Sequence, residues 1–374
     1  MTNMGNVLGI VFSNMHDSTV EELTKERTMG SILFGGRYRL IDFTLSNMVN
    51  SGITKVGVIT KANFQSLLDH LGSGREWDLA RKKGGLHILP PFGNNNAGIY
   101  RGRIEALSGV MSFLSCVKEE YVFMSDCDIV ANMNIKPIIK AHIAKNADIT
   151  VVTKKDVFAM EQTRFSTVIA KDENDKVYDV LINPEISGMC NLSLNMFVVK
   201  KDFLIQLVQN AISRSQYSFE RDILQAKIKE LNVYAYNYEG YMSRIDSVNS
   251  YYKANMDLLE EENKRVLFPA NLPIYTKVRD NAPCKYGIGS NVKNSIIADG
   301  CVIEGEVENC VIFRGVKIES GARVRNSIIM QDTIISKKCD LNYIITDKDV
   351  SIGENRSLHG SQLYPLYVGK GAKV

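Results

Sequence analysis

The amino-acid sequence predicts an α/β domain with Rossmann-like layers, followed by a parallel β-helix. The chain has 374 residues, which exceeds the roughly 250 to 300 residues at which a single hydrophobic core stops growing, so we expect two domains. Short β-branched runs alternate with amphipathic stretches early in the chain, and short apolar triplets repeat near its end. We place the α/β domain at residues 1–260, a linker at 261–290 and the β-helix at 291–374.

The N-terminal alternation is typical of β-α-β units around a mainly parallel sheet. The expected strands are Val7–Phe12, Lys55–Thr60, Tyr121–Ser125, Ile149–Thr153, Leu194–Val199 and Asn232–Tyr236. The expected helices, which carry apolar residues near helical spacing, are Leu40–Ser51, Phe64–Leu71, Arg103–Phe113, Ile135–Lys145 and Lys201–Ala211.

Beyond Leu272 the helical period disappears and apolar triplets begin about every six residues, with Gly or Asn between them. This spacing predicts hexapeptide coils, in which an inward aliphatic side chain stacks on the coil beneath. We expect Ile296 and Ile328 to point inward. An antiparallel β-sandwich, the alternative, would need longer strands joined by hairpin turns. The triplets start at Ser295, Cys301, Cys310, Val316, Ala322, Ser327, Thr333 and Val350.

The composition excludes several classes of protein. The 45 basic and 42 acidic residues nearly balance, so nucleic acid and anionic lipid are not expected as main partners. We find neither a run of about 18 apolar residues nor a signal-peptide pattern, which predicts a cytoplasmic protein. The seven cysteines lack the spacing of a disulfide framework or a zinc site.

Several blocks of sequence resemble one family. The longest reads FGGRYRLIDF over Phe34–Phe43. Other blocks follow in order at His70–Gly74, Trp77–Leu79, Gly84–Gly85, Leu89–Pro91, Tyr100–Gly102, Ser250–Tyr252, Ala254–Leu259 and Leu272–Thr276. Over nearly the whole chain this pattern is similar to the bacterial glucose-1-phosphate adenylyltransferases, also called ADP-glucose pyrophosphorylases. The resemblance implies a nucleotidyltransferase domain followed by a left-handed β-helix, assembled as a tetramer.

Members of that family transfer the adenylyl group of ATP to glucose 1-phosphate and release pyrophosphate. A glycine-rich turn after the first strand lets backbone N–H groups approach the triphosphate. In this chain the three glycines of the turn become Asn14, Met15 and Asp17, and its arginine becomes Thr19. The bulk of Met15 and the charge of Asp17 oppose ATP binding. A divergent loop that still holds a nucleotide is the alternative.

The resemblance places Mg²⁺ between two carboxylates. The direct counterpart of the first is Cys127, and a shift of one residue makes Asp126 or Asp128 the ligand. The second becomes Arg244, with Asp246 two residues further along the same strand face. We therefore expect no metal ion and no catalytic residue in this chain, with Mg²⁺ at Asp126, Asp128 and Asp246 as the alternative.

Sugar-phosphate recognition is also reduced. The family's lysine that pairs with the phosphate of glucose 1-phosphate becomes Asn183. The positions Tyr100, Gly102 and Ser193 are retained from the substrate site. Packing or turn geometry would explain these three residues equally well.

These losses are separate in sequence but affect one activity, whereas the blocks of the core are kept. The chain therefore resembles the non-catalytic GlgD-type subunits of the family. We expect a regulatory or structural subunit of glucose-1-phosphate adenylyltransferase in glycogen (alpha-glucan) biosynthesis, in a homo- or hetero-tetramer with a catalytic chain that binds Mg²⁺. The alternatives are a self-sufficient, divergent nucleotidyltransferase, a stand-alone sugar-phosphate sensor, and a β-helix acyltransferase, for which His359 is the available histidine.

We expect contacts with the partner at Trp77–Leu79, at Gly84–Pro91 and on the outer face of the β-helix. A sugar phosphate is a candidate effector, because arginine side chains match phosphate oxygens. A solvated surface is the alternative for these basic residues near the domain junction. They are Arg37, Arg39, Arg314, Lys317, Arg323 and Arg325.

Overall fold

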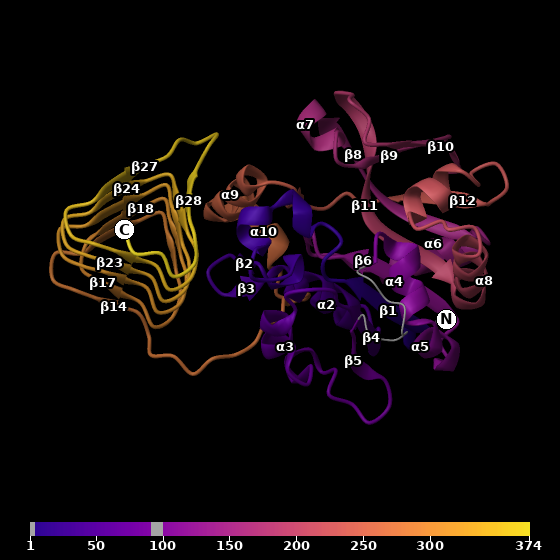
Figure 1. Ribbon diagram of the computed structural model, residues 1–374, viewed down its shortest axis with the longest axis horizontal. Helices are drawn as coiled ribbons and strands as arrows, with labels where there is room; N and C mark the ends of the chain where they lie inside the picture. The colour runs from indigo at the N-terminus through magenta and orange to yellow at the C-terminus, as the bar shows by residue number, and fades with distance from the viewer. Residues whose placement is uncertain (1–3, 91–99) are drawn as a thin grey trace.

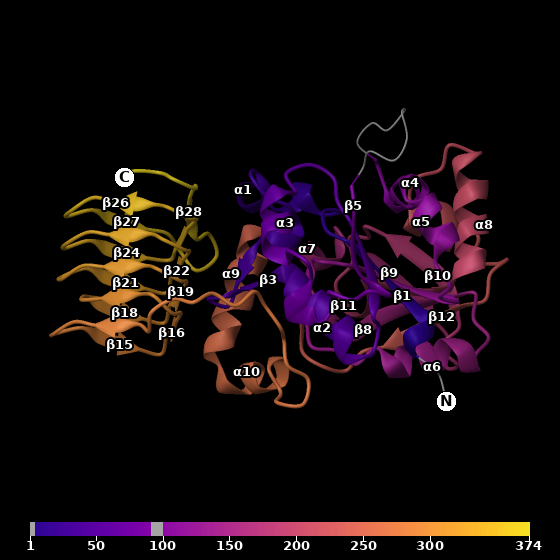
Figure 2. The same cartoon turned by 90° about the horizontal axis from the view of Figure 1, so that it is seen from below.

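The computed structural model describes residues 4–90 and 100–374. Figure 1 shows the β-helix end-on beside a layered α/β domain, and Figure 2 shows its coils stacked in a column. The predicted fold, a Rossmann-like α/β domain followed by a left-handed parallel β-helix, is confirmed. In the described ranges, no helix has both the length and the apolar character that crossing a bilayer requires.

Nine strands of the described residues form the main sheet. Its order is β10-β9-β11-β6-β1-β4-β5, and β8 joins β11 and then pairs with β12. The bounds are β1 Val7–Phe12, β4 Lys55–Ile59, β5 Gly85–Leu89, β6 Tyr121–Asp126, β8 Ile149–Phe158, β9 Thr167–Lys171, β10 Val177–Ile182, β11 Gly188–Lys200 and β12 Val233–Asn237.

The sheet is mixed rather than mainly parallel, which corrects the prediction. Strands β6, β1, β4 and β5 run parallel, as do β8 and β12. Strand β11, however, is antiparallel to β6, β8 and β9, and β10 is antiparallel to β9. The prediction failed because an apolar run buried on both faces has the same sequence pattern in either strand direction.

The main sheet separates two hydrophobic cores. Along β1 the side chains alternate, so that Val11 enters the core on one face and Ile10 the core on the other. Gly9 lies where a Cβ atom would come 2.6 Å from the Sδ of Met48, so helix α2 packs directly on the backbone of the central strand. This close packing fixes the end of β1, from which the candidate site begins.

The helices lie close to their predicted positions, with one exception. The stretch predicted as one helix over Arg103–Phe113 is two helices, because α4 ends at Gly109, a poor helix former, and a new helix starts after Val110. A π-helical segment, Phe219–Gln225, follows α8. The helix bounds are α1 Glu21–Thr24, α2 Leu40–Asn50, α3 Gln65–Leu71, α4 Arg103–Gly109, α5 Met111–Cys116, α6 Lys136–Ala144, α7 Met160–Thr163, α8 Lys201–Ile212, α9 Val248–Met256 and α10 Glu261–Leu267.

Three parallel sheets form the sides of the β-helix, which rules out the antiparallel sandwich. The first contains β14 Lys285–Tyr286, β17 Val302–Ile303, β20 Lys317–Ile318, β23 Ile334–Ile335 and β26 Ser351–Ile352. The second contains β15 Asn291–Lys293, β18 Glu306–Glu308, β21 Arg323–Arg325, β24 Asp340–Asn342 and β27 Ser357–His359. The third contains β16 Ile296–Ile297, β19 Val311–Ile312, β22 Ile328–Ile329, β25 Ile344–Thr346 and β28 Leu366–Val368. The segment 261–290, which the sequence suggested as a linker, includes α10 and β14.

The expectation that Ile296 and Ile328 point into the coil is wrong. Ile328 is fully buried, but it belongs to the core of the α/β domain, and the half-buried Ile296 packs against that same core. Their neighbours Ile297 and Ile329 lie in the core of the coil instead. The third sheet therefore buries both of its faces, one inside the β-helix and one against the α/β domain.

Candidate site at the ends of β1 and β6

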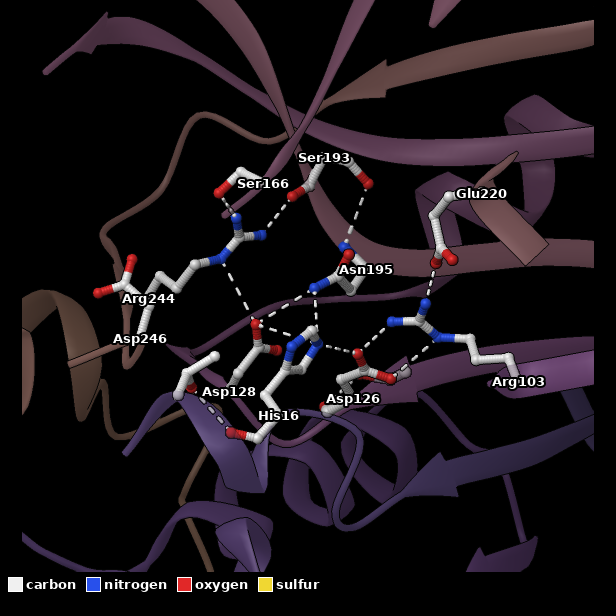
Figure 3. Close-up of polar contacts among 12 residues, drawn as sticks. His16, Arg103, Asp126, Asp128, Ser166, Ser193, Asn195, Glu220, Arg244 and Asp246 are labelled. Atoms are coloured by element: carbon white, nitrogen blue, oxygen red, sulfur yellow. Dashed lines mark hydrogen bonds and ion pairs between the residues drawn. The ribbon is translucent and has the colours of Figure 1, made fainter. Parts of the chain in front are cut away.

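Two aspartates lie at the end of β6, and both are buried. Asp126 is the last residue of the strand, and Asp128 precedes β7 Ile129–Ala131, which pairs with β13 Met242–Arg244. Between them Cys127 points the other way, into the hydrophobic core near Gly30. This geometry resolves the register that the sequence left open, because both carboxylates and not the thiol face the site (Figure 3).

Arg103 holds the first of these carboxylates. Its guanidinium donates hydrogen bonds to both carboxylate oxygens of Asp126, and the distance from Nε to Oδ1 is 3.3 Å. It also donates a hydrogen bond to Glu220 of the π-helical segment. Burial would raise the pKa of Asp126, but Arg103 and His16 hold it below its ordinary value. Asp126 is therefore an anion that already has its counter-ions.

His16 lies between the two aspartates, in the loop after β1. Its Nε2 is 2.7 Å from Asp126 and 3.8 Å from Asp128. Burial works to lower the pKa of His16, but the charges of Asp128 and Asp126 together raise it above its ordinary value.

Arg244 reaches the second carboxylate from β13. Its Nε is 3.4 Å from Asp128, and its terminal nitrogens bond the hydroxyl of Ser166 and the carbonyl of Ser193 (Figure 3). Asn195 adds a bond from Nδ2 to the same carboxylate at 3.2 Å. Arg244 therefore connects β13 to the residue before β9 and to β11 across the site.

Asp246 lies outside this group. Its side chain accepts a bond from Ser247, the N-cap of α9, and Figure 3 shows it turned away from Asp126 and Asp128. Burial raises the pKa of Asp246. Of the predicted metal ligands, the structure thus brings Asp126 and Asp128 together but not Asp246.

The donor atoms of His16, Asp126 and Asp128 lie within 4.8 Å of one another, which is close enough to share a metal ion. The group does not fit Mg²⁺, however, because Mg²⁺ prefers six oxygen ligands in octahedral geometry. Here one donor is a histidine nitrogen, and both carboxylates already contact arginines. A divalent cation would have to compete with these two arginine side chains.

The loop that replaces the glycine-rich turn is closed on itself. Its 3₁₀ turn, Asp17–Thr19, is held by Thr19, which donates to the carbonyl of His16 at 2.8 Å. No residue from Asn14 to Thr19 has a positive φ, so the loop lacks the left-handed backbone with which glycine-rich turns converge N–H groups on a phosphate. The loop is shaped by its own contacts.

Burial raises the pKa of Asp17 to about 7, although the Met29 amide, Lys61 and His16 oppose the shift. The Met29 amide donates to Asp17 at 2.8 Å. Asp17 thus takes up the backbone donor of Met29.

The residues retained from the substrate site have internal partners. The Tyr100 hydroxyl lies 2.9 Å from Asn14 Oδ1 and 3.0 Å from the carbonyl of Thr60. At Gly102 a Cβ atom would lie 2.3 Å from the carbonyl oxygen of Tyr217. The carbonyl of Ser193 accepts from Arg244, and Asn183 adopts a left-handed turn conformation at the surface. Packing and turn geometry account for these positions.

Sequence reasoning missed His16, Arg103, Asn195 and Glu220. Arg103 directly follows a block that the sequence had singled out, and His16 lies within the altered loop, so both were near a visible signal. Glu220 and Asn195 come from segments with no motif. They are brought to the site by the fold alone.

A second cationic group lies between the two domains. Arg37, Arg39 and Arg314 line one pocket together with His70, Lys277 and Arg279. The other three predicted basic residues lie elsewhere: Lys317 is exposed, Arg323 pairs with Glu306, and Arg325 pairs with Asp340. His359 is exposed on the outside of β27, 3.8 Å from Asp340 of the neighbouring coil.

Beside this pocket Arg27 forms a buried ion pair with Asp347 at 2.8 Å. Burial, with Arg39, Arg27 and Arg279 nearby, lowers the pKa of Lys348 to about 7. We call Arg27, Arg39, Arg279 and Lys348 the junction cluster. Its cations come from both domains.

Comparisons with known proteins agree with this architecture. Residues 18–261 match the model of the family described as nucleotidyl transferase, and residues 283–360 match that of the GlmU-like, C-terminal hexapeptide. The glycogen biosynthesis protein GlgD of Bacillus subtilis is 35% identical over 98% of this chain and 96% of its own length. The glucose-1-phosphate adenylyltransferase of Fervidobacterium nodosum is 33% identical over 94% of this chain and 84% of its own. The glucose-1-phosphate adenylyltransferase of Clostridium novyi is 32% identical over 86% of this chain and 84% of its own length.

Proposed function

The chain belongs to the bacterial glucose-1-phosphate adenylyltransferase family, and from that premise we propose that it is a non-catalytic, regulatory or structural subunit of this enzyme in glycogen (alpha-glucan) biosynthesis. The observation that carries the proposal is the pairing of Asp126 and Asp128 with Arg103, Arg244 and His16. Carboxylates that would hold Mg²⁺ in a working transferase are neutralised by the protein itself.

Electrostatics supports this proposal. Three acidic groups, Asp126, Asp128 and Glu220, face three basic ones, Arg103, Arg244 and His16. A Mg²⁺ ion brought into this group would have to displace an arginine from a carboxylate. Separating a buried ion pair by removing one partner costs about 3–5 kcal/mol, so the metal-free arrangement is strongly favoured.

The altered loop supports it further. Transfer of an adenylyl group depends mostly on positioning and on neutralising the phosphates. Here Met15 packs partly against the hydrophobic core, and Asp17 takes up the Met29 amide. We propose that this chain needs no cofactor of its own, and that Mg²⁺ acts in a catalytic partner chain.

We propose that the partner is a catalytic glucose-1-phosphate adenylyltransferase chain and that the two kinds of chain assemble as a hetero-tetramer. This chain then raises the activity of the partner through a contact at their interface, which shifts the partner from a less active to a more active state. Of the contact regions expected from the sequence, Trp77 is buried while Asp78 is exposed, and Pro91 lies outside the described residues. Asp78, which lies between the buried Trp77 and Leu79, is therefore the accessible residue of that block.

Co-expression with the catalytic chain of the same organism is expected to give one mixed oligomer on size-exclusion chromatography. We expect the partner's kcat/KM to rise between about five- and 150-fold, which corresponds to about 1–3 kcal/mol of coupling. Separate elution, with unchanged kinetics at high concentrations of this chain, would refute the proposal. A self-sufficient transferase, the alternative, would instead turn over without any partner.

We further propose that the junction cluster binds the phosphate group of a sugar-phosphate effector whose sugar lies outside the pocket, since the pocket has a volume of only about 20 Å³. The lowered pKa of Lys348 gives this proposal a pH signature. A bound phosphate dianion favours protonated Lys348 and so raises its pKa. Binding above pH 7 therefore takes up a proton, and affinity falls as the pH rises.

Isothermal titration with glucose 6-phosphate is expected to show affinity falling up to about tenfold per pH unit above pH 7. The phosphate itself, with a second pKa of about 6, is fully ionised there and adds little. The Lys348→Met variant is the control, since it keeps Arg27, Arg39 and Arg279 but cannot titrate. Identical pH profiles for the two proteins would exclude Lys348 from the effector site.

A further inference from the structure

A hollow of about 590 Å³ lies between α6 and β12, and it shares no lining residue with the candidate site. Figures 1 and 2 both show α6 beside β12 near the edge of the main sheet. The volume is within the range of about 300–1,000 Å³ that is typical of small-molecule sites. Nothing in the proposed subunit role uses this feature.

Tyrosines dominate one wall of the hollow. Tyr234, Tyr236 and Tyr238 alternate along β12 and the residue that follows it, so their side chains lie on one face. All three side chains are half-buried, and Tyr236 and Tyr238 pack partly against the hydrophobic core of the α/β domain. In a strand, alternate side chains are roughly 6–7 Å apart, so the wall presents successive ring surfaces along its length.

Hydrogen bonds fix this wall before any ligand arrives. The Tyr238 hydroxyl donates to the carbonyl of Asn132 at 2.9 Å. Asn237 accepts the amide of Lys155 at 3.0 Å, which fixes the orientation of its side-chain amide. A wall whose groups are already held loses little entropy when it binds.

The charges around the hollow select the class of ligand. Among the described residues that line it, Lys145 is the single cation, and it is already committed. Its Nζ donates to Asp175 and to the carbonyl of Asn174, each at 2.9 Å, and lies 5.0 Å from the centre of the Tyr234 ring. With Glu239 as a further acidic residue, the site has no free cation for a phosphate.

The other polar groups that line the hollow are suited to hydrogen bonds with the hydroxyl groups of a ligand. Asn134 and Asn237 offer amides, and the carboxylate of Glu239 accepts hydrogen bonds. Aromatic faces together with amide and carboxylate groups match a ligand that has apolar ring faces and many hydroxyls. A neutral saccharide has both.

We propose that this hollow binds a segment of an α-linked glucan. The saccharide class follows from the lining, whereas the choice of an α-glucan rests on the proposed role in glycogen biosynthesis. Such a site would hold the subunit, and any enzyme assembled with it, on the surface of the growing polymer.

Titration calorimetry of the full chain with maltoheptaose tests the proposal. Binding is expected for the unmodified protein and should weaken at least about tenfold in Ala141→Arg, because the new side chain fills the hollow. Ala144→Arg adds the same charge to the exposed end of the same helix and should bind as the unmodified protein does. Arginine is a good helix former, so both variants are expected to fold.

The tyrosine wall has its own pair of variants. Tyr236→Ala should lose at least about tenfold in affinity, while Tyr236→Phe, which keeps the ring, should stay within about twofold. Three results would each overturn the proposal: no binding of maltoheptaose, equal binding of β-linked cellohexaose, or binding of adenosine in its place.

This test is independent of the proposed function. Ala141→Arg should still form the mixed oligomer and still raise the partner's activity, since the hollow has no part in that contact. A chain that activates its partner but ignores maltoheptaose would leave the subunit proposal intact and remove the glucan site.

Discussion

The purified chain, assayed alone with ATP, Mg²⁺ and glucose 1-phosphate, is expected to form ADP-glucose at least about a thousand times more slowly than a catalytic relative. The phosphate loop, the metal site and the sugar-phosphate lysine are each altered, and removal of one stabilising group in an active site typically costs about 3–4 kcal/mol. Because each 1.4 kcal/mol is about tenfold in rate, two such losses already exceed the expected factor.

A matched variant shows whether traces of host enzyme contribute to the measured activity. The double change Asp126→Asn and Asp128→Asn removes the carboxylates on which any rearranged metal site of this chain would depend. Residual activity that survives the double change comes from a contaminant. A turnover near 10 s⁻¹, typical of ordinary enzymes, that disappears in the double variant would show a self-sufficient transferase instead.

The β-helix should respond differently to acidic substitutions at two adjacent positions. Ile329→Asp puts an unpaired carboxylate inside the coil, which should cost several kcal/mol and unfold the coil. Ile328→Asp puts the same group between the domains, so the coil should stay folded while the α/β domain detaches from it. Both side chains are completely buried in the native protein.

Thermal unfolding and limited proteolysis separate the two outcomes. Ile328→Asp should expose the connection between α10 and β14 to protease, whereas Ile329→Asp should expose the coil itself. Ile334→Asp is the control, since Ile334 is 37% exposed and should change stability by no more than about 0.5 kcal/mol. If Ile328→Asp behaves like Ile334→Asp, the domain interface seen in the structure is wrong.

The sequence was informative about the fold where a pattern has one physical meaning. Triplets about six residues apart fit a β-helix better than an antiparallel sandwich, whose strands would be longer, so its parallel sheets were predictable. The inward face was not, because the third sheet is apolar on both sides, and a pattern of Ile pairs cannot tell the coil interior from the domain interface. The direction of β11 was hidden for a similar reason, since its apolar run is buried on both faces.

For the site, sequence reasoning identified what had been lost but not what had replaced it. A missing glycine or lysine is visible against a family pattern, and the structure brings together Asp126 and Asp128, which the sequence had named as alternative ligands. The compensating cations have no motif, because Arg103, His16 and Arg244 come from three distant segments. Only the fold brings them together, and Glu220, which completes the charge balance, belongs to a π-helical segment that no periodicity predicted.

The ion pair between Arg27 and Asp347 joins residues 320 positions apart, and this sets the order in which the protein can be finished. A ribosome that adds about 5–20 residues per second releases the α/β domain well before the last coils exist. Until the last coils are made, the guanidinium of Arg27 lacks its counter-ion Asp347. The apolar face around Ile328 is then exposed to solvent. A chain cut short in those coils would expose both defects together, so we expect cells to degrade such a fragment rather than assemble it.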